Sequence, residues 1–296
     1  MSPEQQGPIL RAVRPASTAP RTAFVLSGGA SLGAMQAGML RALYECGITA
    51  DFLVGTSAGA LNAAFIAGRS QTPAAAKDLA NAWRGMSRED VFPIHMPTVV
   101  GGLAKRCDHV VPDAALRRAA AKHLRIARLE EACVPAHLVT FDLLSGREVL
   151  LSSGPADDAI LAAAAIPGVL PPVPWGEHLL VDGGVVNNTP ISHAVELGAE
   201  RIFVLPTGDP GDRGLAARPS GAVDAAVHAF TLLVGARLEA DLARYRAEAE
   251  VIVLPVTRHL RVSPTDFDQA ELLIAGALRA ARRYLRSSGV AQQLAA

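Results

Sequence analysis

The sequence of 296 residues is poor in aromatic residues and carries no excess of either charge. Its 28 basic residues balance 28 acidic residues, and only 4% of its residues are aromatic. A balanced charge provides no long-range field that attracts nucleic acid, and scarce aromatic rings provide few platforms for stacking single-stranded bases. We therefore expect no nucleic-acid partner.

Cysteine is also scarce. The three cysteines, Cys46, Cys107 and Cys133, form no CxxC pair, and their odd number argues against a disulfide framework. Such usage indicates a reducing compartment and predicts a cytoplasmic protein, with at most peripheral contact with a membrane. The sequence has no HExxH motif or comparable spacing of metal ligands, so we expect no metal and no other cofactor.

Long hydrophobic runs are absent as well, because no uncharged apolar stretch reaches the roughly 18 residues that a membrane-spanning helix needs. The first residues, 1–21, are rich in Pro, Ser and Gln and have no signal-peptide core, so we expect a flexible N-terminal arm. The longest weakly polar stretch, 91–103, contains two prolines. We interpret it as a buried core segment, with an apolar lid or an interfacial patch as the alternative.

Hydrophobic residues make up half of the chain and recur as short runs between helical patterns. Strands that are apolar almost throughout, alternating with helices, predict an α/β fold: a mostly parallel central sheet with helices on both faces. No linker is long enough to divide the chain, so 22–296 is predicted to form a single domain with a mobile loop at 207–221. The predicted strands are 22–27, 51–56, 137–144, 148–153, 178–182, 201–207 and 250–256, and the predicted helices lie near 34–46, 58–68, 73–84, 112–123, 157–165, 190–198, 222–248 and 266–287.

The sequence GTSAG at 55–59 lies between a predicted strand and a predicted helix, which is the context that a GxSxG nucleophile motif needs. A serine on such a sharp turn exposes its hydroxyl above the edge of the sheet. Gly55 and Gly59 have no Cβ, so the helix can approach the strand closely. Ser57 is therefore a candidate nucleophile, and the alternative is an ordinary helix N-cap.

A serine nucleophile needs a base. Eight histidines follow Ser57, and none lies in a glycine-flanked loop just after a predicted strand. Asp182, by contrast, ends the apolar strand HLLVD and is followed by Gly183 and Gly184, which permit a tight turn. Reacting groups gather at such strand ends in open α/β sheets. Position alone explains Asp182 equally well as a base or as a turn former.

The stretch SGGASLGAMQAG at 27–38 joins the first predicted strand to a helix, as phosphate-binding loops do. It matches neither GxGxxG nor a P-loop, which ends in GK[ST]. The sequence therefore disfavours a nucleotide-binding module.

Three segments in this order, SGGASLGAMQAGMLRAL, GTSAG and VDGGVVNNTPI, resemble the patatin-like phospholipases, bacterial members especially. AAAAIPGVLPPV (162–173) and FDLLSGREVLLSSG (141–154) resemble further blocks of that family. The likeness covers roughly residues 22–206, which hold the core motifs. It implies a three-layer α/β sandwich that hydrolyses fatty-acyl esters of lipids without a metal.

The resemblance also implies roles for individual residues. It implies a serine–aspartate dyad without a catalytic histidine, with Ser57 as nucleophile and Asp182 as base. In the family the glycine-rich loop forms the oxyanion hole, which here comprises the backbone N–H groups of Gly28, Gly29 and Ala30.

The loop departs from the family's usual G-G-G-x-[RK]-G pattern, although Gly33 is retained. Ala30 replaces a glycine and tolerates fewer backbone conformations. Leu32 replaces a cation, which predicts a weaker preference for phospholipid head groups. Two alternatives to the hydrolase stay open: a catalytically weak regulatory or scaffold member of the family, and a histidine-dependent serine acyltransferase or hydrolase.

The last predicted helix carries four arginines on one face. We interpret this face as solvated, with transient contact with an anionic membrane surface as the alternative. The four are Arg279, Arg282, Arg283 and Arg286.

Overall fold

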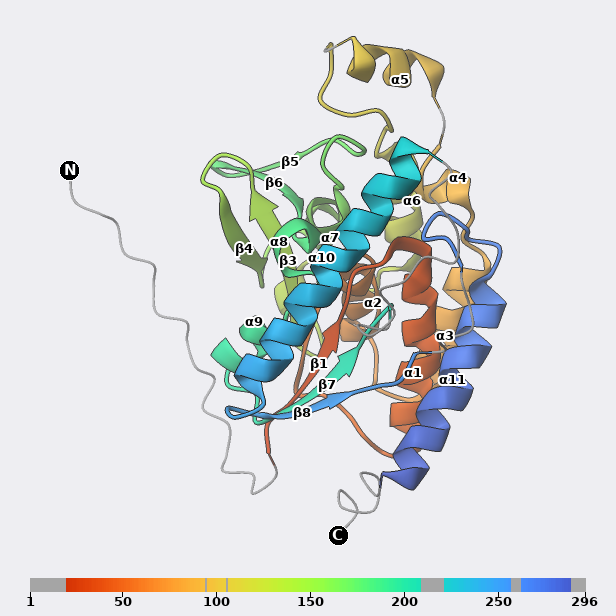
Figure 1. Ribbon diagram of the computed structural model, residues 1–296, viewed down its shortest axis with the longest axis vertical. Helices are drawn as coiled ribbons and strands as arrows, with labels where there is room; N and C mark the ends of the chain where they lie inside the picture. Colours follow the sequence, from red (N-terminus) through yellow and green to blue (C-terminus); the bar gives the residue numbers. More distant parts are fainter. Residues whose placement is uncertain (1–19, 94, 105, 209–220, 257–261, 289–296) are drawn as a thin grey trace, which may run out of the picture.

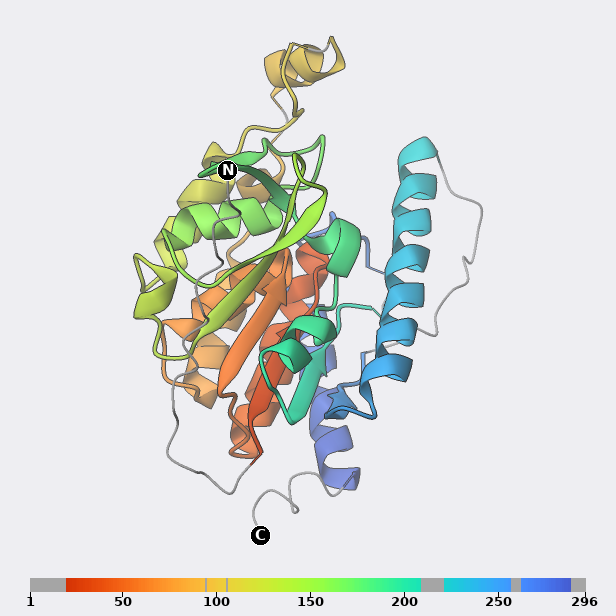
Figure 2. The ribbon, with the colours of Figure 1, turned by 90° about the vertical axis from the view of Figure 1, so that its left-hand side faces the viewer.

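The computed structural model describes residues 20–93, 95–104, 106–208, 221–256 and 262–288. These residues form a central sheet of eight strands with helices on both faces, as Figure 1 and Figure 2 show. The α/β fold predicted from the sequence is confirmed. The strands are β1 (Thr22–Leu26), β2 (Phe52–Thr56), β3 (Ala136–Asp142), β4 (Arg147–Leu151), β5 (Val173–Trp175), β6 (His178–Asp182), β7 (Arg201–Leu205) and β8 (Glu250–Val253).

The sheet has the order β5-β6-β3-β2-β1-β7-β8, and β4 pairs with β3 outside this row. Strands β3, β2, β1, β7 and β8 run parallel, whereas β4, β5 and β6 run antiparallel to their partners. In the pairing with β3, Thr56 of β2 lies beside Val139 and Asp182 of β6 lies beside Thr140. The ends of β2 and β6 are therefore neighbours, although 126 positions separate Thr56 and Asp182 in the sequence.

Alternate residues of the strands enter two separate hydrophobic clusters. Phe24 and Leu26 of β1 pack with one layer of helices, and Ala23 and Val25 pack with the other. The first layer is α1 (Ala34–Glu45), α2 (Ala58–Ala67), α3 (Pro73–Arg84), α6 (Ala114–His123), α7 (Ala156–Ala164) and α11 (Ala270–Ser287), and the second is α9 (Ile191–Glu196) and the C-terminal part of α10 (Ala222–Tyr245).

Several short elements were not predicted: β5, the 3-10 helices η1 (Ala30–Gly33) and η2 (Leu129–Glu131), and the helices α4 (Arg88–Val91), α5 (Met96–Leu103) and α8 (Gly184–Asn187). The interpretation of 91–103 as a buried core segment is wrong for helix α5, although Val91 and Phe92 pack against the core. This helix projects beyond the body of the protein (Figure 1), and its Met96 and Val100 side chains are 62% and 55% exposed. The prediction was wrong because apolar composition does not by itself determine burial.

Two predicted mobile segments fall largely outside the described residues: the arm at 1–21, of which only Pro20 and Arg21 are described, and the loop at 207–221. All three cysteines are free. Among the described helices, none has the length and apolar character needed to cross a bilayer.

The four arginines on one face of α11 lie in two different environments. Both Nε and Nη2 of Arg282 bond the carboxylate of Glu45 on α1, each at 2.7 Å. Arg282 therefore holds α11 against α1, while Arg279, Arg283 and Arg286 are exposed, as a solvated face requires.

Candidate active site

Ser57 forms the turn that joins β2 directly to α2. Its backbone has φ 55° and ψ −126°, and Ala30 is the other described non-glycine residue with a positive φ. Such conformations cost an L-residue on the order of 1–3 kcal/mol and persist only where the surrounding structure enforces them. The Ser57 side chain makes no capping hydrogen bond to α2, so the N-cap interpretation gains no support.

Close packing of α2 on the sheet enforces this turn. A Cβ at Gly59 would overlap the carbonyl groups of Leu26 and Ser27, and a Cβ at Gly55 would overlap the carbonyl group of Gly59. A larger residue at either glycine would therefore push α2 away from the sheet and displace Ser57.

Asp182 lies at the end of β6 and is only 4% exposed. Its Oδ1 accepts a hydrogen bond of 2.8 Å from the N–H of Gly184. Burial raises the pKa of Asp182 to about 6, because a buried carboxylate loses its hydration, while hydrogen bonds with Ser57 and Gly184 partly offset this rise. The structure thus brings Ser57 and Asp182 together.

Gly183 precedes Gly184 in the turn after Asp182 and packs against β3. A Cβ at Gly183 would overlap the carbonyl oxygen of Val139. The space at this turn therefore admits no side chain at that position without a shift of β3 or β6.

The glycine-rich loop lies beside Ser57, but its first N–H group is already engaged. The N–H of Gly28 donates to the carbonyl oxygen of Asn188 at 3.0 Å. The Gly28 carbonyl in turn accepts from the Asn188 amide and the Thr207 hydroxyl. An N–H held in this way by a carbonyl oxygen is not free to bind a substrate oxygen. Gly29 packs against Thr207, where a Cβ would overlap its side chain.

Ala30 begins η1 with φ 48°, which is the left-handed conformation that glycine adopts most readily. It lines the pocket that contains Ser57, together with Ala58. Gly33 ends η1, where a Cβ would overlap that of Ala58. The loop therefore packs directly against the first turn of α2.

A buried polar network behind the loop was missed by sequence reasoning. Gln36 donates to the carbonyl groups of Ser27 and Leu205, and Asn62 donates to Gln36 and to the carbonyl group of Gly33. The indole N–H of Trp83 completes it with a bond of 2.8 Å to Asn62. The available signal was an amide side chain on the apolar face of α1 and another in α2, which is otherwise apolar, and both amides are fully buried.

The pocket at Ser57 is apolar. Apart from Ser57, the residues that line it are hydrophobic: Ala30, Ala58, Leu61, Trp83, Met86, Val91, Phe92, Leu116, Ala164, Ile166 and Phe267. A second apolar cavity adjoins it, since Leu61, Trp83 and Met86 line both.

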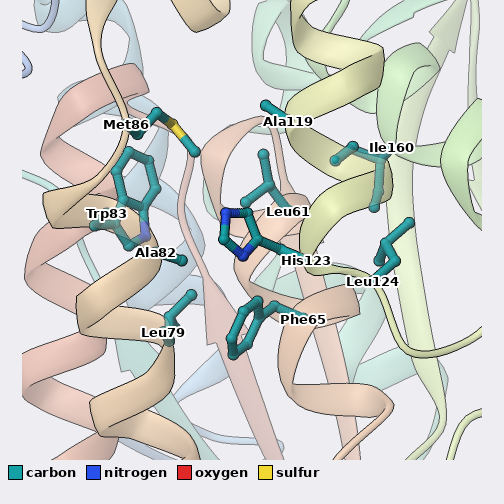
Figure 3. Close-up of a pocket in the computed structure, with 11 residues that line it drawn as sticks. Leu61, Phe65, Leu79, Ala82, Trp83, Met86, Ala119, His123, Leu124 and Ile160 are labelled. Carbon is teal, nitrogen blue, oxygen red and sulfur yellow. The ribbon is translucent and has the colours of Figure 1, made fainter.

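Figure 3 shows this second cavity, in which the His123 ring lies between Leu61 and Phe65. Burial lowers the pKa of His123 because it disfavours the charged imidazolium, and neighbouring cations add to the effect. His123 thus belongs to the adjoining cavity, and no described histidine lines the pocket at Ser57.

Metal ligands do not gather at this site. Within the part of the chain that the structure describes, no cluster of three or more His, Cys, Asp or Glu side chains is arranged to hold a metal ion. What the described geometry offers is a serine on a strained turn, a buried carboxyl group and an apolar pocket.

Comparison with known families assigns the chain to a family. The family model of the patatin-like phospholipases matches residues 24–195, more than half of the chain, and this range contains both Ser57 and Asp182. The chain belongs to the patatin-like phospholipase family. Leu32, which stands where patatin-like phospholipases commonly carry a cation, is partly buried and packs against the hydrophobic core.

Patatin-like relatives of this chain are much longer proteins. The chain is 29% identical over 194 residues to patatin-like phospholipase domain-containing protein 7 of Mus musculus, covering 63% of this chain and 13% of the relative. It is 32% identical over 178 residues to an uncharacterized NTE family protein of Mycobacterium tuberculosis, covering 56% of this chain and 27% of the relative. The chain thus spans less than a third of the length of these relatives.

Among solved structures, VipD from Legionella pneumophila is similar to this patatin-like chain with a TM-score of 0.46 and 14% sequence identity. The superposition covers 90% of this chain and 67% of VipD.

Proposed function

We propose that the protein hydrolyses fatty-acyl esters of lipids, with Ser57 as the nucleophile and Asp182 as the base. The observation that carries this proposal is the placement of Ser57 beside a buried carboxyl group, that of Asp182, whose pKa is raised to about 6. A base with such a pKa is mostly ionised at neutral pH and is still basic enough to take a proton in the transition state.

The reaction proceeds through an acyl-enzyme. The Ser57 oxygen bonds to the ester carbonyl carbon as its proton passes to Asp182. The tetrahedral intermediate then breaks its bond to the alcohol oxygen, which leaves with the proton from Asp182. Water attacks the acyl-enzyme, Asp182 takes the water proton and returns it to the Ser57 oxygen, and the fatty acid is released.

The negative oxygen of each tetrahedral intermediate needs N–H donors. We assign this role to Gly29, Ala30 and Ala58 in place of the predicted set that included Gly28. Ala30 and Ala58 line the pocket at Ser57, and Ala58 begins α2, whose N-terminus favours negative charge. Removing one such donor costs about 3 kcal/mol of transition-state stabilisation.

The character of the pocket indicates that the protein recognises the acyl group of a lipid substrate. Its lining is apolar, and Leu61, Trp83 and Met86 separate it from the adjoining cavity at His123, which they also line. An acyl chain whose carbonyl group lies at Ser57 extends into this space. With Leu32 packed against the core, no cation at this position selects a phosphate head group.

The test is turnover of a soluble p-nitrophenyl ester by matched variants. We expect Ser57→Ala to lower kcat at least about a thousandfold and Asp182→Asn to come close to that, because the two act as a unit. Ser153→Ala, which changes an exposed serine, is the control and keeps the wild-type rate. Wild-type rates in Ser57→Ala or Asp182→Asn would exclude the dyad.

Two other outcomes point to the alternatives. If the folded wild-type protein turns over no acyl ester, the chain is a regulatory or scaffold member of the family. If His123→Ala abolishes turnover while the protein stays folded, the reaction depends on histidine.

A further inference from the structure

The exposed large apolar side chains of the described residues are concentrated in a few segments. They belong to α5, the turn between β3 and β4, α8, the N-terminal part of α10 and the first turn of α11. The residues are Met96 and Val100, Leu143 and Leu144, Val185, Val227, Phe230, Leu232 and Leu233, and Leu272.

Helix α10 is divided into an anchored part and an exposed part. Leu238, Asp241 and Tyr245 of its C-terminal part are buried, and Asp241 is paired with Arg237 at 2.8 Å. Between Asp224 and Arg237 the sequence has no Asp, Glu, Lys or Arg.

Within this uncharged stretch the large side chains are exposed on several sides. Val227, Phe230 and Leu233 are spaced three residues apart and lie along one side of the helix, where Leu233 is 70% exposed. Leu232 is also exposed and lies opposite Phe230, because two steps of 100° separate them. A helix that is apolar all round is normally covered by another apolar medium.

The other segments are also apolar and exposed. Helix α5 has no ionisable residue over its whole length, Met96–Leu103. Leu143 and Leu144 follow the carboxyl end of β3, and Val185 lies three positions after Asp182. The β3–β4 turn and α8 therefore present apolar surface next to the strand ends that carry the candidate active site.

The segments also lie toward one end of the molecule. In Figure 1 and Figure 2, α5 and the N-terminal end of α10 rise toward the end at which the parallel strands finish, which is the end of the sheet that bears Ser57. The C-terminal part of α11, with its exposed arginines, lies toward the opposite end (Figure 1). The apolar surface and the arginine face are thus separated.

We propose that α5, the β3–β4 turn, α8 and the N-terminal part of α10 form a docking surface for a lipid layer. We call these segments the apolar end. Their complementarity is one of charge: α5, the β3–β4 turn, α8 and residues 225–236 of α10 contain no Asp, Glu, Lys or Arg, so they match the uncharged interior of a lipid layer, which a charged surface would not enter. Docking rests on apolar insertion, so it requires neither anionic lipid nor the arginines of α11.

This inference deepens the proposed function, because docking by the apolar end brings the pocket at Ser57 to the lipid that supplies the acyl ester. Docking by the apolar end does not depend on catalysis, so a catalytically inactive variant should also bind lipid. Vesicle binding and ester turnover can therefore fail independently of each other.

The experiment is co-sedimentation of the full chain with vesicles of zwitterionic phosphatidylcholine at low and high salt. Leu233→Asp and Met96→Asp are expected to lower the partition coefficient about tenfold or more, since each removes an apolar side chain from the lipid and introduces a charge. Arg283→Glu, on the opposite end, is the control and should bind as the wild type does, in either salt. Ser57→Ala should also bind normally.

Turnover of a soluble short-chain ester verifies that the variants are folded, since these exposed side chains lie outside the proposed catalytic machinery. The inference is overturned if the wild type does not bind zwitterionic vesicles, or if binding needs anionic lipid and is lost in Arg283→Glu. It is also overturned if Leu233→Asp binds vesicles normally but dissociates a dimer in solution, because the surface would then join two copies of the chain.

Discussion

Asp182, buried at the end of β6, lies beside Ser57 on the turn after β2. The pairing of both strands with β3 at adjacent positions, Val139 and Thr140, accounts for this contact. Residues far apart in the chain are thereby held together by the backbone of the sheet, which is the rigid support that a catalytic pair needs.

Activity should depend on the ionisation of Asp182. Its pKa is raised to about 6, and only the ionised form accepts the Ser57 proton. We therefore expect kcat/KM for a soluble ester to be constant above pH 7 and to fall about tenfold for each pH unit below the pKa of Asp182. Initial rates between pH 4 and 8, with folding verified by tryptophan fluorescence, measure the profile. A flat profile between pH 5 and 7 would rule out Asp182 as the base.

The same raised pKa predicts that the native carboxylate is destabilising. Since the folded protein binds this proton more tightly than the unfolded chain, ionisation of Asp182 lowers stability as the pH rises from about 4 to about 6. A shift of about two pKa units corresponds to about 3 kcal/mol. Asp182→Asn should therefore raise the free energy of unfolding by about 1–3 kcal/mol at pH 7 and by much less at pH 4. Urea unfolding at both pH values measures this, and an equal gain at both would contradict the assignment.

The network behind the glycine-rich loop should position that loop. Trp83→Phe keeps an aromatic ring in place but leaves the Asn62 carbonyl oxygen without its 2.8 Å partner. We expect a loss of stability of about 1–3 kcal/mol and a lower kcat, because Asn62 also holds the carbonyl group of Gly33. Trp175→Phe, a matched change in β5, is the control for kcat. A purely structural role for Trp83 predicts lower stability with an unchanged kcat in the folded protein.

The cavity at His123 should limit the length of the acyl chain. Ala119 lines this cavity but not the pocket at Ser57, so Ala119→Trp fills the far space alone. We expect kcat/KM to fall at least about tenfold for long-chain p-nitrophenyl esters and to stay unchanged for the acetate, because only a long chain buries apolar surface in the far space. Ala121→Trp, an exposed position on the same helix, is the control. Equal losses for short and long chains would show that the chain does not enter this cavity.

Hydrophobic periodicity predicted the alternation of strands and helices, because each buried face imposes its period on the sequence. It also predicted the limits of α3. Asp182 was different. Its position at a strand end did not distinguish a base from a turn former, since the antiparallel pairing of β6 with β3 is a long-range property.

Other features depend on distant partners and could not be read locally. Gly28 has its N–H bonded to Asn188, 160 positions later in the chain, which no loop motif reveals. The sequence did not predict the exposure of Met96 and Leu233 for a related reason. An apolar segment has the same sequence pattern whether the fold buries it or leaves it exposed to solvent.

The most direct measurement of the central claim is covalent labelling of the intact protein by a fluorophosphonate, read by mass spectrometry. The reagent phosphonylates an activated serine, so we predict one adduct per wild-type chain at pH 7.5, located on the peptide that contains Ser57. Labelling should be absent in Ser57→Ala, strongly slowed in Asp182→Asn, and unchanged in His123→Ala. An adduct on another residue, or equally rapid labelling of Asp182→Asn, would contradict a nucleophile at Ser57 activated by Asp182.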